Sequence, residues 1–322
     1  MNLISNTAGG RQQLVSIVIP FFNEGKCVQN FFNRLFPVLN QIKSSIDLDY
    51  ELICVDDGST DDTLVLLLSV AKSYKSIKVV ELSRNFGKEA ALTAGIDSAV
   101  GDAVIPIDCD LQDPPELIPK LIERWLLGFD VVLAKKDDRL CDSCMKRWTA
   151  HLFYRLHSLV SDTQIPEGVG DFRLMNRAAV DALKRMPERQ RFMKGLFSWV
   201  GFKTDVVLYK REPRSGGASK FSGWMLWNFA LEGFTSFSTS PLRMWTYIGG
   251  AATLISLTYA LYIVFRTLIQ GIDLPGYASL LVAILFLGGL QLLSIGLLGE
   301  YIGRIYMESK GRPIYIVRNN HG

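Results

Sequence analysis

Residues 103–121, AVIPIDCDLQDPPELIPKL, contain in one stretch the pattern that organises the first half of the chain. The stretch begins with an apolar run typical of a buried strand. Three acids follow, Asp108, Asp110 and Asp113, and then two prolines open a run with helical periodicity. Proline is well tolerated at the first position of a helix. The stretch therefore predicts a buried strand that ends in carboxylates and leads into a helix.

The spacing of the acids suggests a metal site. Asp108 and Asp110 are two residues apart, so an extended backbone places both carboxylates on one face. Like charges this close are unfavourable unless a cation lies between them, and carboxylate oxygens suit Mg²⁺ or Mn²⁺. Gln112 lies on the same face if the extended course continues. We therefore predict a divalent cation at Asp108, Asp110 and Gln112, with two solvated loop acids as the alternative, because D-x-D is a frequent pattern.

Strands and helices alternate in the same way from residue 15 to residue 136. The predicted strands are 15–20, 50–55, 77–82, 102–108 and 130–136, and the predicted helices are about 24–43, 61–74, 88–99 and 115–128. The strands are continuously apolar, which is typical of a parallel sheet covered by helices on both faces. The sequence therefore predicts an α/β fold with a mostly parallel, Rossmann-like sheet.

Polar residues follow four of these strands, at 20–24, 56–59, 83–85 and 108–110. The carboxyl ends of parallel strands meet at one edge of the sheet, where ligands bind. Ordinary turn chemistry explains any single one of these segments, because Asp, Asn, Gly and Ser favour turns. The four together predict one site.

The pattern changes after residue 140. We expect a short strand at GDFRLM, 170–175, a helix at 187–201, a strand at 203–212 and then a glycine-rich basic loop, PRSGGASKF, at 213–221. Residues 222–243 are aromatic and too polar to span a bilayer, so we expect helices lying in the membrane interface. Packing of this segment against the preceding α/β domain is the alternative.

Two uncharged apolar runs near the C-terminus, 245–265 and 277–298, predict a helical hairpin that crosses a membrane, with helices at about 245–267 and 277–299. Two buried core helices are the alternative. The linker between them carries one basic residue, Arg266, whereas several follow Leu298, so the positive-inside rule places both termini in the cytoplasm. The N-terminus has no apolar signal segment, which agrees with this orientation.

Net charge and cysteine content indicate which binding partners and which cellular compartment to expect. The formal net charge of +3 is too weak to indicate nucleic-acid binding. The five cysteines are scattered and odd in number, as expected for reduced thiols in the cytosol. The CDSC stretch at 141–144 has no second ligand pair nearby, so we interpret it as structural or incidental rather than as a zinc or redox site.

The motifs VSIVIPFFNE, VDDGSTDDT, LSRNFGKEAAL, DCDLQDPP and GDFRLM occur in an order and spacing that resemble the family 2 glycosyltransferases of the GT-A fold. The segments MPERQRFMKG, NFALEGFTSFS and GLLGEYIGRIY bring the chain closer to the polyprenyl-phosphate glycosyltransferases of the bactoprenol glucosyltransferase type, which are related to dolichol-phosphate mannose synthase. The resemblance covers the chain after residue 14 and implies a GT-A domain at 15–221. With the segments predicted from the residues themselves, the chain divides further into a disordered N-terminus at 1–14, interfacial helices at 222–243, two transmembrane helices within 244–299 and a cytoplasmic tail at 300–322.

The same resemblance implies a role for each matching residue. The nucleotide sugar would be bound by Pro20, Asn23, Glu24, Asp56, Asn85, Gly87, Lys88 and Asp108. The metal would be held by Asp108, Asp110 and Gln112, with Asp110 and Asp171 as catalytic residues and Asp171 either a base or a positioning group. Phosphate or acceptor contacts would come from Arg214, Ser219, Lys220 and Arg191. Asp57 and Gly58 are interpreted as turn-forming residues.

The reaction that the resemblance implies is inverting transfer of glucose from UDP-glucose to undecaprenyl phosphate, at the cytoplasmic face of the bacterial cytoplasmic membrane. The product would be a lipid-linked sugar for O-antigen or cell-envelope glycosylation, made by a homo-oligomer and moved by a separate flippase. Another donor remains open: GDP-mannose, a UDP-N-acetylhexosamine or a modified arabinose. A processive synthase is disfavoured, because its Q-x-x-R-W motif is missing and one hairpin does not make a channel. A non-enzymatic membrane adaptor is the remaining rival.

Overall fold

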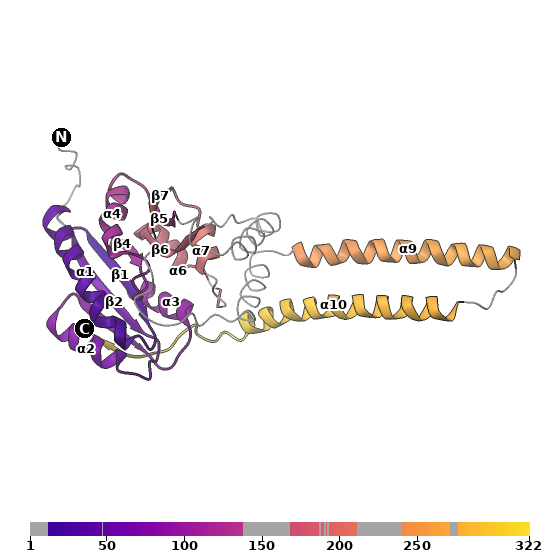
Figure 1. The fold of residues 1–322 in the computed structure, drawn as a ribbon, viewed down its shortest axis with the longest axis horizontal. Helices are drawn as coiled ribbons and strands as arrows, with labels where there is room; N and C mark the ends of the chain where they lie inside the picture. The colour runs from indigo at the N-terminus through magenta and orange to yellow at the C-terminus, as the bar shows by residue number, and fades with distance from the viewer. Residues whose placement is uncertain are drawn as a thin grey trace.

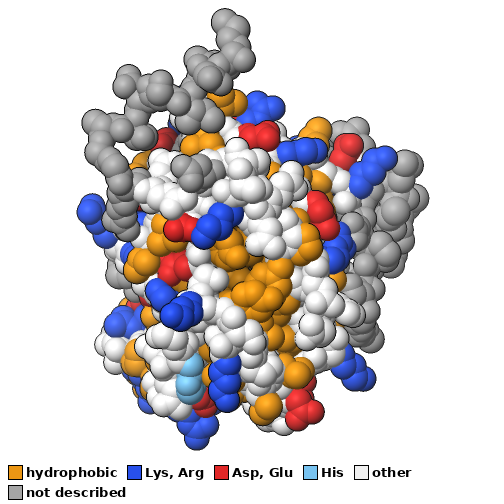
Figure 2. All heavy atoms as spheres, turned by 90° about the vertical axis from the view of Figure 1, so that its left-hand side faces the viewer, with side chains coloured by type: hydrophobic (Ala, Val, Ile, Leu, Met, Phe, Trp, Pro, Cys, Tyr) orange, Lys and Arg blue, Asp and Glu red, His pale blue; other side chains and the backbone are white. Residues whose placement is uncertain are grey.

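The computed structural model describes residues 12–46, 48–137, 168–186, 188–189, 191, 193–210, 240–270 and 276–322. These residues form an α/β domain built on one sheet, from which two long helices project side by side (Figure 1). The face of the domain turned away from the two helices carries basic and acidic side chains interspersed around a small apolar area (Figure 2). A mixed-charge surface of this kind is typical of a face in water.

The elements follow the predicted order closely. The strands are β1 (Leu14–Phe21), β2 (Asp49–Asp56), β3 (Ile77–Leu82), β4 (Ala103–Pro106), β5 (Val131–Lys136), β6 (Val169–Asn176), β7 (Thr204–Tyr209) and β8 (Val317–His321). The helices are α1 (Gly25–Ile46), α2 (Thr63–Ser73), α3 (Lys88–Ser98), the 3₁₀ turn η1 (Pro115–Leu117), α4 (Ile118–Leu126), α6 (Arg177–Lys184), α7 (Met193–Trp199), α9 (Ser240–Gln270) and α10 (Tyr277–Ser309). The alternation predicted between residues 15 and 136 is confirmed. Of the helix predicted over 187–201, the described residues show α7.

The sheet is mostly parallel, as predicted, with strand order β7-β5-β6-β4-β1-β2-β3-β8. Two of its strands run antiparallel to their neighbours. β6 lies between β4 and β5, with Val104 opposite Met175, and β8 pairs with β3. Because β6 is reversed, its first residues lie at the edge where the parallel strands end.

Helices cover both faces of the sheet. Alternate residues of β1 point to opposite sides: Ile17 and Ile19 pack in the core under α1 and α4, and Val18 packs in the core under α3 and α6. The helix α3 lies so close to the sheet that a Cβ on Gly95 would come within 2.2 Å of Val18 Cγ1. Both faces are therefore dry, which explains why the parallel strands are apolar throughout.

The C-terminal segment differs from the predicted tail at 300–322. The helix α10 continues to Ser309, and Val317–His321 then forms β8 on the outer edge of β3. The backbone N–H of Ser83 donates to the carbonyl of Ile316 at 2.9 Å, which extends this pairing past the end of β3. The segment VRNNH has no apolar alternation, so its strand structure comes from pairing with β3 rather than from its own sequence pattern.

A buried carboxylate on β3 holds the new strand in place. Glu81 Oε1 lies 3.2 Å from Arg318 Nη1, and its Oε2 accepts from Asn319 Nδ2 at 2.9 Å and lies 3.4 Å from His321 Nε2. Burial alone would raise the pKa of Glu81, but the contacts with Asn319, His321 and Arg318 outweigh it and hold the pKa below its ordinary value. Residues 317–321 are therefore part of the sheet domain.

The end of α10 is fixed to the same domain by Arg189. The backbone N–H of Arg189 donates to Glu308 Oε1 at 2.8 Å, and its side-chain Nε donates to the carbonyl of Arg312 at 2.7 Å. Farther along, the hydroxyl of Tyr315 donates to Asp97 Oδ2 on α3 at 2.8 Å. The helix pair is thus joined to the sheet domain by several side-chain contacts as well as by the covalent chain.

The two long helices contact each other and expose apolar side chains such as Leu254 and Leu292. Among the described residues, the stretch Phe286–Ser309 of α10 is 24 residues long and apolar enough to cross a membrane, and none of it is buried. The predicted spans at about 245–267 and 277–299 lie within α9 and α10. Of the predicted interfacial segment, residues 222–239 lie outside the described residues, as do residues 1–11 of the predicted N-terminal segment.

We predict that Glu81→Ala lowers the free energy of unfolding by about 2 kcal/mol, because Asn319 and Arg318 lose their partner and β8 separates from β3. The measurement is chemical unfolding in detergent. Since the folded-state pKa of Glu81 is lowered, its contribution is present above the ordinary glutamate pKa and is lost as the pH falls through the folded value. The difference from wild type should therefore shrink in acid.

The control for this prediction is Glu116→Ala, which removes an exposed ion pair with Arg34. Exposed pairs contribute at most about 1 kcal/mol, so this variant should remain close to wild type. Equal unfolding of the two variants would contradict the role assigned to Glu81.

Candidate active site at the carboxyl edge of the sheet

The ends of four parallel strands meet at one edge, as the sequence predicted. In register, Phe21 at the end of β1 lies opposite Asp56 at the end of β2, and Asp56 lies opposite Glu81 of β3. The backbone N–H of Ile107 donates to the carbonyl of Val18 at 2.9 Å, which continues β4 along β1. The reversed strand β6 adds Asp171 to this edge. Five segments of the chain therefore supply side chains to one place.

Asn23 joins the first two of these segments. Its backbone is left-handed, with φ of 53°, and its Oδ1 accepts from the backbone N–H of Thr60 at 2.8 Å. Its own N–H donates to Ser59 Oγ at 3.0 Å, and the N–H of the next residue, Glu24, donates to Thr63 Oγ1 at 3.0 Å. These contacts hold the segment after Pro20 against the turn that follows β2.

Asp56 lies beneath that turn and is 1% exposed. Its Oδ2 accepts from the backbone N–H of Ser59 at 3.2 Å, while its Oδ1 is buried and has no hydrogen-bond partner within the described part of the chain. Burial raises the pKa of Asp56, and the bonds from Ser59 oppose this only in part. A buried acceptor without a donor is costly, so this environment favours a ligand that supplies a hydroxyl or an N–H.

Asp57 and Gly58 form the turn, as interpreted from the sequence, and they also fix the next segment. Asp57 accepts from the backbone N–H of Phe86 at 2.8 Å and of Gly87 at 2.9 Å. Burial raises the pKa of Asp57, although these two amides favour its charged form. Gly58 has φ of +66°, and a Cβ there would lie 2.4 Å from the carbonyl carbon of Arg84. The segment that contains Asn85 and leads into α3 is therefore held by Asp57.

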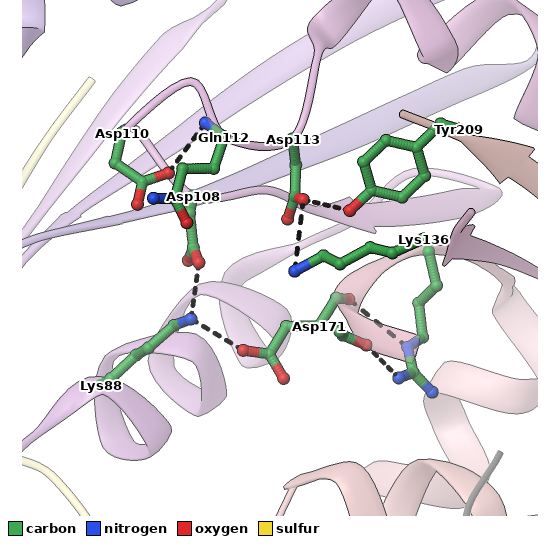
Figure 3. A network of polar contacts seen from close by, with 10 residues as sticks. Lys88, Asp108, Asp110, Gln112, Asp113, Lys136, Asp171 and Tyr209 are labelled. Carbon is green, nitrogen blue, oxygen red and sulfur yellow. Dashed lines mark hydrogen bonds and ion pairs between the residues drawn. The ribbon is translucent and has the colours of Figure 1, made fainter. Parts of the chain in front are cut away.

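The segment after β4 carries the predicted metal ligands. Asp108, Asp110 and Gln112 are partly exposed, while Cys109 and Leu111 between them are buried. The extended course that we expected here does not continue, because β4 ends at residue 106 and Leu111 adopts a left-handed φ of 59°. A turn, closed by the N–H of Gln112 donating to Asp110 Oδ1 at 3.1 Å, places the three polar side chains together instead (Figure 3).

The donor chemistry of this turn fits a divalent cation that binds together with a substrate. Within the residues described, no cluster of three or more His, Cys, Asp and Glu side chains is arranged to hold a metal. Asp108 and Asp110 offer carboxylate oxygens and Gln112 offers an amide oxygen, which are hard donors of the type that Mg²⁺ and Mn²⁺ prefer. They are too few to fill the coordination sphere. Oxygens of a phosphate-bearing ligand would have to complete it.

Lys88 connects this turn to Asp171. The ammonium of Lys88 lies 2.7 Å from Asp108 Oδ2 and 2.7 Å from Asp171 Oδ2 (Figure 3). Burial alone would lower the pKa of Lys88, but the two carboxylates outweigh it and raise the pKa above its ordinary value. Burial raises the pKa of Asp108, and Lys88 opposes that effect. Residues from α3, the β4 turn and β6 thus meet around one cation.

Asp113, the third acid of the opening stretch, has a different role. It is buried and accepts a hydrogen bond from the hydroxyl of Tyr209 at the end of β7, and its Oδ1 lies 3.9 Å from Lys136 Nζ (Figure 3). Asp113 therefore anchors the predicted metal turn, residues 108–112, and is not one of its predicted ligands. Lys136 was missed by the sequence analysis. Its position at the carboxyl end of the fifth strand was the signal that could have identified it.

Two arginines, Arg173 and Arg191, mainly support the backbone. Arg173 is 3% exposed, donates to the carbonyl of Gly170 at 2.6 Å and packs over the ring of Phe197 at 4.0 Å. Burial lowers the pKa of Arg173 to about 10. Arg191 donates to the carbonyls of Met186 and Glu188 at 3.0 Å and 3.2 Å. The other predicted phosphate contacts, Arg214, Ser219 and Lys220, lie outside the described residues.

Comparison with known proteins identifies related chains. The family model for Glycosyl transferase family 2 matches residues 16–184, and that for the GtrB C-terminal hairpin matches residues 240–305. The chain is 52% identical to a bactoprenol glucosyl transferase of Shigella phage SfV, over 95% of this chain and 98% of the relative. It is 51% identical to the prophage bactoprenol glucosyl transferase homolog of Escherichia coli K12, over 94% and 98%.

The chain is also similar to one further relative of high sequence identity and to one solved structure of low identity. An uncharacterized glycosyltransferase of Synechocystis is 52% identical over 96% of both chains. The crystal structure of glucosyl-3-phosphoglycerate synthase from Mycobacterium tuberculosis, in complex with Mn²⁺, UDP-glucose and phosphoglyceric acid, is a distant likeness. It shares 20% identity and a TM-score of 0.45, covering 69% of this chain and 78% of that one.

We predict that Asp57→Asn speeds amide hydrogen exchange at Phe86 and Gly87 by about tenfold or more, because an amide group replaces one of the two acceptor oxygens. The free energy of unfolding should fall by about 1–2 kcal/mol. The matched control is Asp62→Asn in the same turn, whose exposed side chain makes no capping bond to α2. If exchange at residues 86 and 87 changed equally in both variants, Asp57 would not be the anchor of this segment.

Proposed function

The chain belongs to glycosyltransferase family 2, and from this premise we propose that it transfers glucose from UDP-glucose to undecaprenyl phosphate. The observation that carries the proposal is the meeting of Asp108, Lys88 and Asp171 at the edge where the strands end. One carboxylate belongs to the expected diphosphate site and the other to the expected reacting centre. The 52% identity with a bactoprenol glucosyl transferase over nearly the whole chain supports the choice of sugar and lipid.

The uridine and ribose would occupy the region of the first two strand ends. Asp56 supports this assignment, because its buried Oδ1 has no donor among the described residues and a ribose hydroxyl would supply one. Pro20, Asn23 and Glu24 would line the same region. The diphosphate would then lie over Asn85, Gly87 and Lys88, where the ammonium of Lys88 reaches Asp108 of the metal turn.

Asp108, Asp110 and Gln112 would hold Mg²⁺ or Mn²⁺ together with the diphosphate. When bound, the cation supplies Lewis-acid neutralisation of the negative charge that develops on the leaving nucleoside diphosphate. The remaining work belongs to the chain itself. Lys88 would donate to the diphosphate, and Asp113 with Tyr209 would keep the turn rigid while the leaving group departs.

The acceptor requires positioning more than deprotonation. A phosphate monoester has a second pKa of about 6 and is largely ionised at neutral pH. Its oxygen would attack the anomeric carbon in a single displacement, which inverts the configuration and gives a β-linked glucosyl phosphate. Asp171 would orient the sugar or the acceptor, while cations would hold the acceptor phosphate; the candidates are Arg191, Lys136, Arg214 and Lys220, with Ser219 as a further donor.

The helix pair would place this reaction at a membrane. We propose that α9 and α10 both cross the bacterial cytoplasmic membrane, with the catalytic domain and both termini in the cytoplasm. The match to the GtrB C-terminal hairpin and the apolar stretch Phe286–Ser309 support this arrangement. The contacts from Arg189 to the end of α10 would hold the active site near the lipid headgroups. The product would need a separate flippase to reach O-antigen or envelope acceptors.

The test is transfer by the full-length protein in detergent, with Mg²⁺ and undecaprenyl phosphate. Labelled UDP-glucose, UDP-N-acetylglucosamine, UDP-galactose, a UDP-linked modified arabinose and GDP-mannose are offered separately. We predict lipid-extractable label from UDP-glucose, and a loss of about 10³-fold in kcat for Asp110→Asn. Label from another donor alone would replace the sugar. No label from any donor, with nucleotide binding intact, would contradict the proposed acceptor.

We predict that Asp171→Asn lowers kcat by about 10²-fold or more and leaves the shape of the pH profile unchanged. The reason is that Asp171 is ion-paired to Lys88, and the acceptor ionises without a base. The profile should retain its acidic limb near the phosphate pKa of about 6. Disappearance of an ionisation from the profile of the variant would instead identify Asp171 as a general base.

A further inference from the structure

Lys88 occupies a position that is unfavourable for a cation unless anions compensate it. It is the first residue of α3, where the helix dipole presents partial positive charge. Its cap residue, Gly87, provides no side-chain hydrogen bond. Compensation comes from Asp108 and Asp171, each 2.7 Å from the ammonium. Without the ammonium, these two carboxylates would face each other across the site and repel.

The ammonium thus neutralises one of the carboxylates that were assigned to the metal. It engages Asp108 Oδ2, which belongs to a carboxylate of the proposed metal turn. A divalent cation bound to this carboxylate would lie beside the ammonium, and the repulsion between them would weaken both contacts. Full occupation of Asp108 by a metal and the Lys88 bridge are therefore in competition.

We propose that Lys88 is an internal counter-ion of the donor site: its ammonium bridges Asp108 and Asp171 in the free protein and is drawn from Asp108 onto the diphosphate when the nucleotide and the metal bind together. This role rests on the proposed function, because it assigns the diphosphate to the same edge. It makes Lys88 a positioning residue for the metal turn as well as a donor to the substrate.

Water reaches the ion pairs of Lys88, so the ammonium can exchange its contact with Asp108 for another anion. The side chains of Lys88, Asp108 and Asp171 are 45%, 31% and 14% exposed. Ion pairs that water can reach contribute little net stability, so breaking one contact is inexpensive. Lysine also has a long flexible stem, which lets the ammonium move while the backbone of α3 stays in place. The contact with Asp171 can persist while the contact with Asp108 is exchanged for a phosphate oxygen.

A measurable coupling follows from this competition. A divalent cation alone must displace the ammonium, so it should bind the free protein weakly. A nucleoside diphosphate offers the ammonium a new partner and the metal additional oxygens, so each ligand should strengthen the other. By thermodynamic linkage, removal of the ammonium should strengthen metal binding to the free protein and reduce the coupling.

The experiment measures Mn²⁺ binding to full-length protein in detergent, using the electron paramagnetic resonance signal of free Mn²⁺, with and without UDP. We expect UDP to tighten Mn²⁺ binding by about 100-fold in the wild type. In Lys88→Met, Mn²⁺ alone should bind about tenfold tighter or more, and the effect of UDP should fall to about tenfold or less. Lys88→Arg should behave like the wild type, because it retains the charge.

The control for loss of one positive charge is Lys43→Met. Lys43 pairs with Asp49 at 2.8 Å at the opposite end of the strands, so this variant should bind Mn²⁺ like the wild type. Thermal unfolding of each variant checks that the domain is folded. If Lys88→Met does not fold, Lys88→Gln takes its place, since it also removes the charge and retains hydrogen-bond donors.

Two results would overturn the counter-ion role: tight Mn²⁺ binding by the wild type without UDP, or unchanged Mn²⁺ affinity in the folded neutral variant. In either case a remaining effect of UDP on Mn²⁺ binding would leave the proposed donor site standing. If UDP changed Mn²⁺ binding in neither the wild type nor the variant, the proposed nucleotide–metal site itself would fail. The two failures are therefore distinguishable.

Discussion

The structure depends on one ionic contact: the carboxylates of Asp108 and Asp171 lie close together because the ammonium of Lys88 compensates their charge. Asp108 follows the end of β4 and Asp171 lies near the start of β6, and they meet because β6 is inserted antiparallel between β4 and β5. Lys88, at the start of α3, pairs with both carboxylates and offsets part of their charge. The parallel order of β1 to β4 supplies the strand ends, the reversal of β6 supplies the facing acid, and the cation makes their proximity tolerable. The residues that shape the site, such as Asp57 and Asp113, keep these segments in register.

Much of this arrangement could be predicted from the sequence, and the limits have physical causes. The strand and helix order was predictable because strands buried on both faces are continuously apolar. The clustering of Asp108, Asp110 and Gln112 was also predictable, although the expected extended course gave way to a turn at Leu111. The pairing of Lys88 with Asp171 was not predictable, since it depends on where β6 is inserted. Local spacing carries no information about that choice.

The strand β8 could not be predicted from local sequence either. It links the long helices to the sheet domain. VRNNH lacks any apolar alternation, so only pairing with β3 makes it a strand. Its carboxylate partner, Glu81, lies at the end of β3, directly before the segment that carries Lys88. Together with Arg189, which fixes the end of α10, β8 connects the long helices to β3, the strand that precedes the Lys88 segment. A rigid connection of this kind suits an enzyme whose second substrate would be held at a fixed height by a membrane.

The central claim is that one site lets the phosphate acceptor attack the sugar donor directly, with no covalent intermediate on the protein. The measurement that tests it most directly is the anomeric configuration of the lipid-linked product, read by nuclear magnetic resonance after synthesis from UDP-α-glucose. A single displacement predicts a β-glucosyl phosphate. An α-glucosyl phosphate would require two displacements or attack on the face of the leaving group, and it would contradict the account.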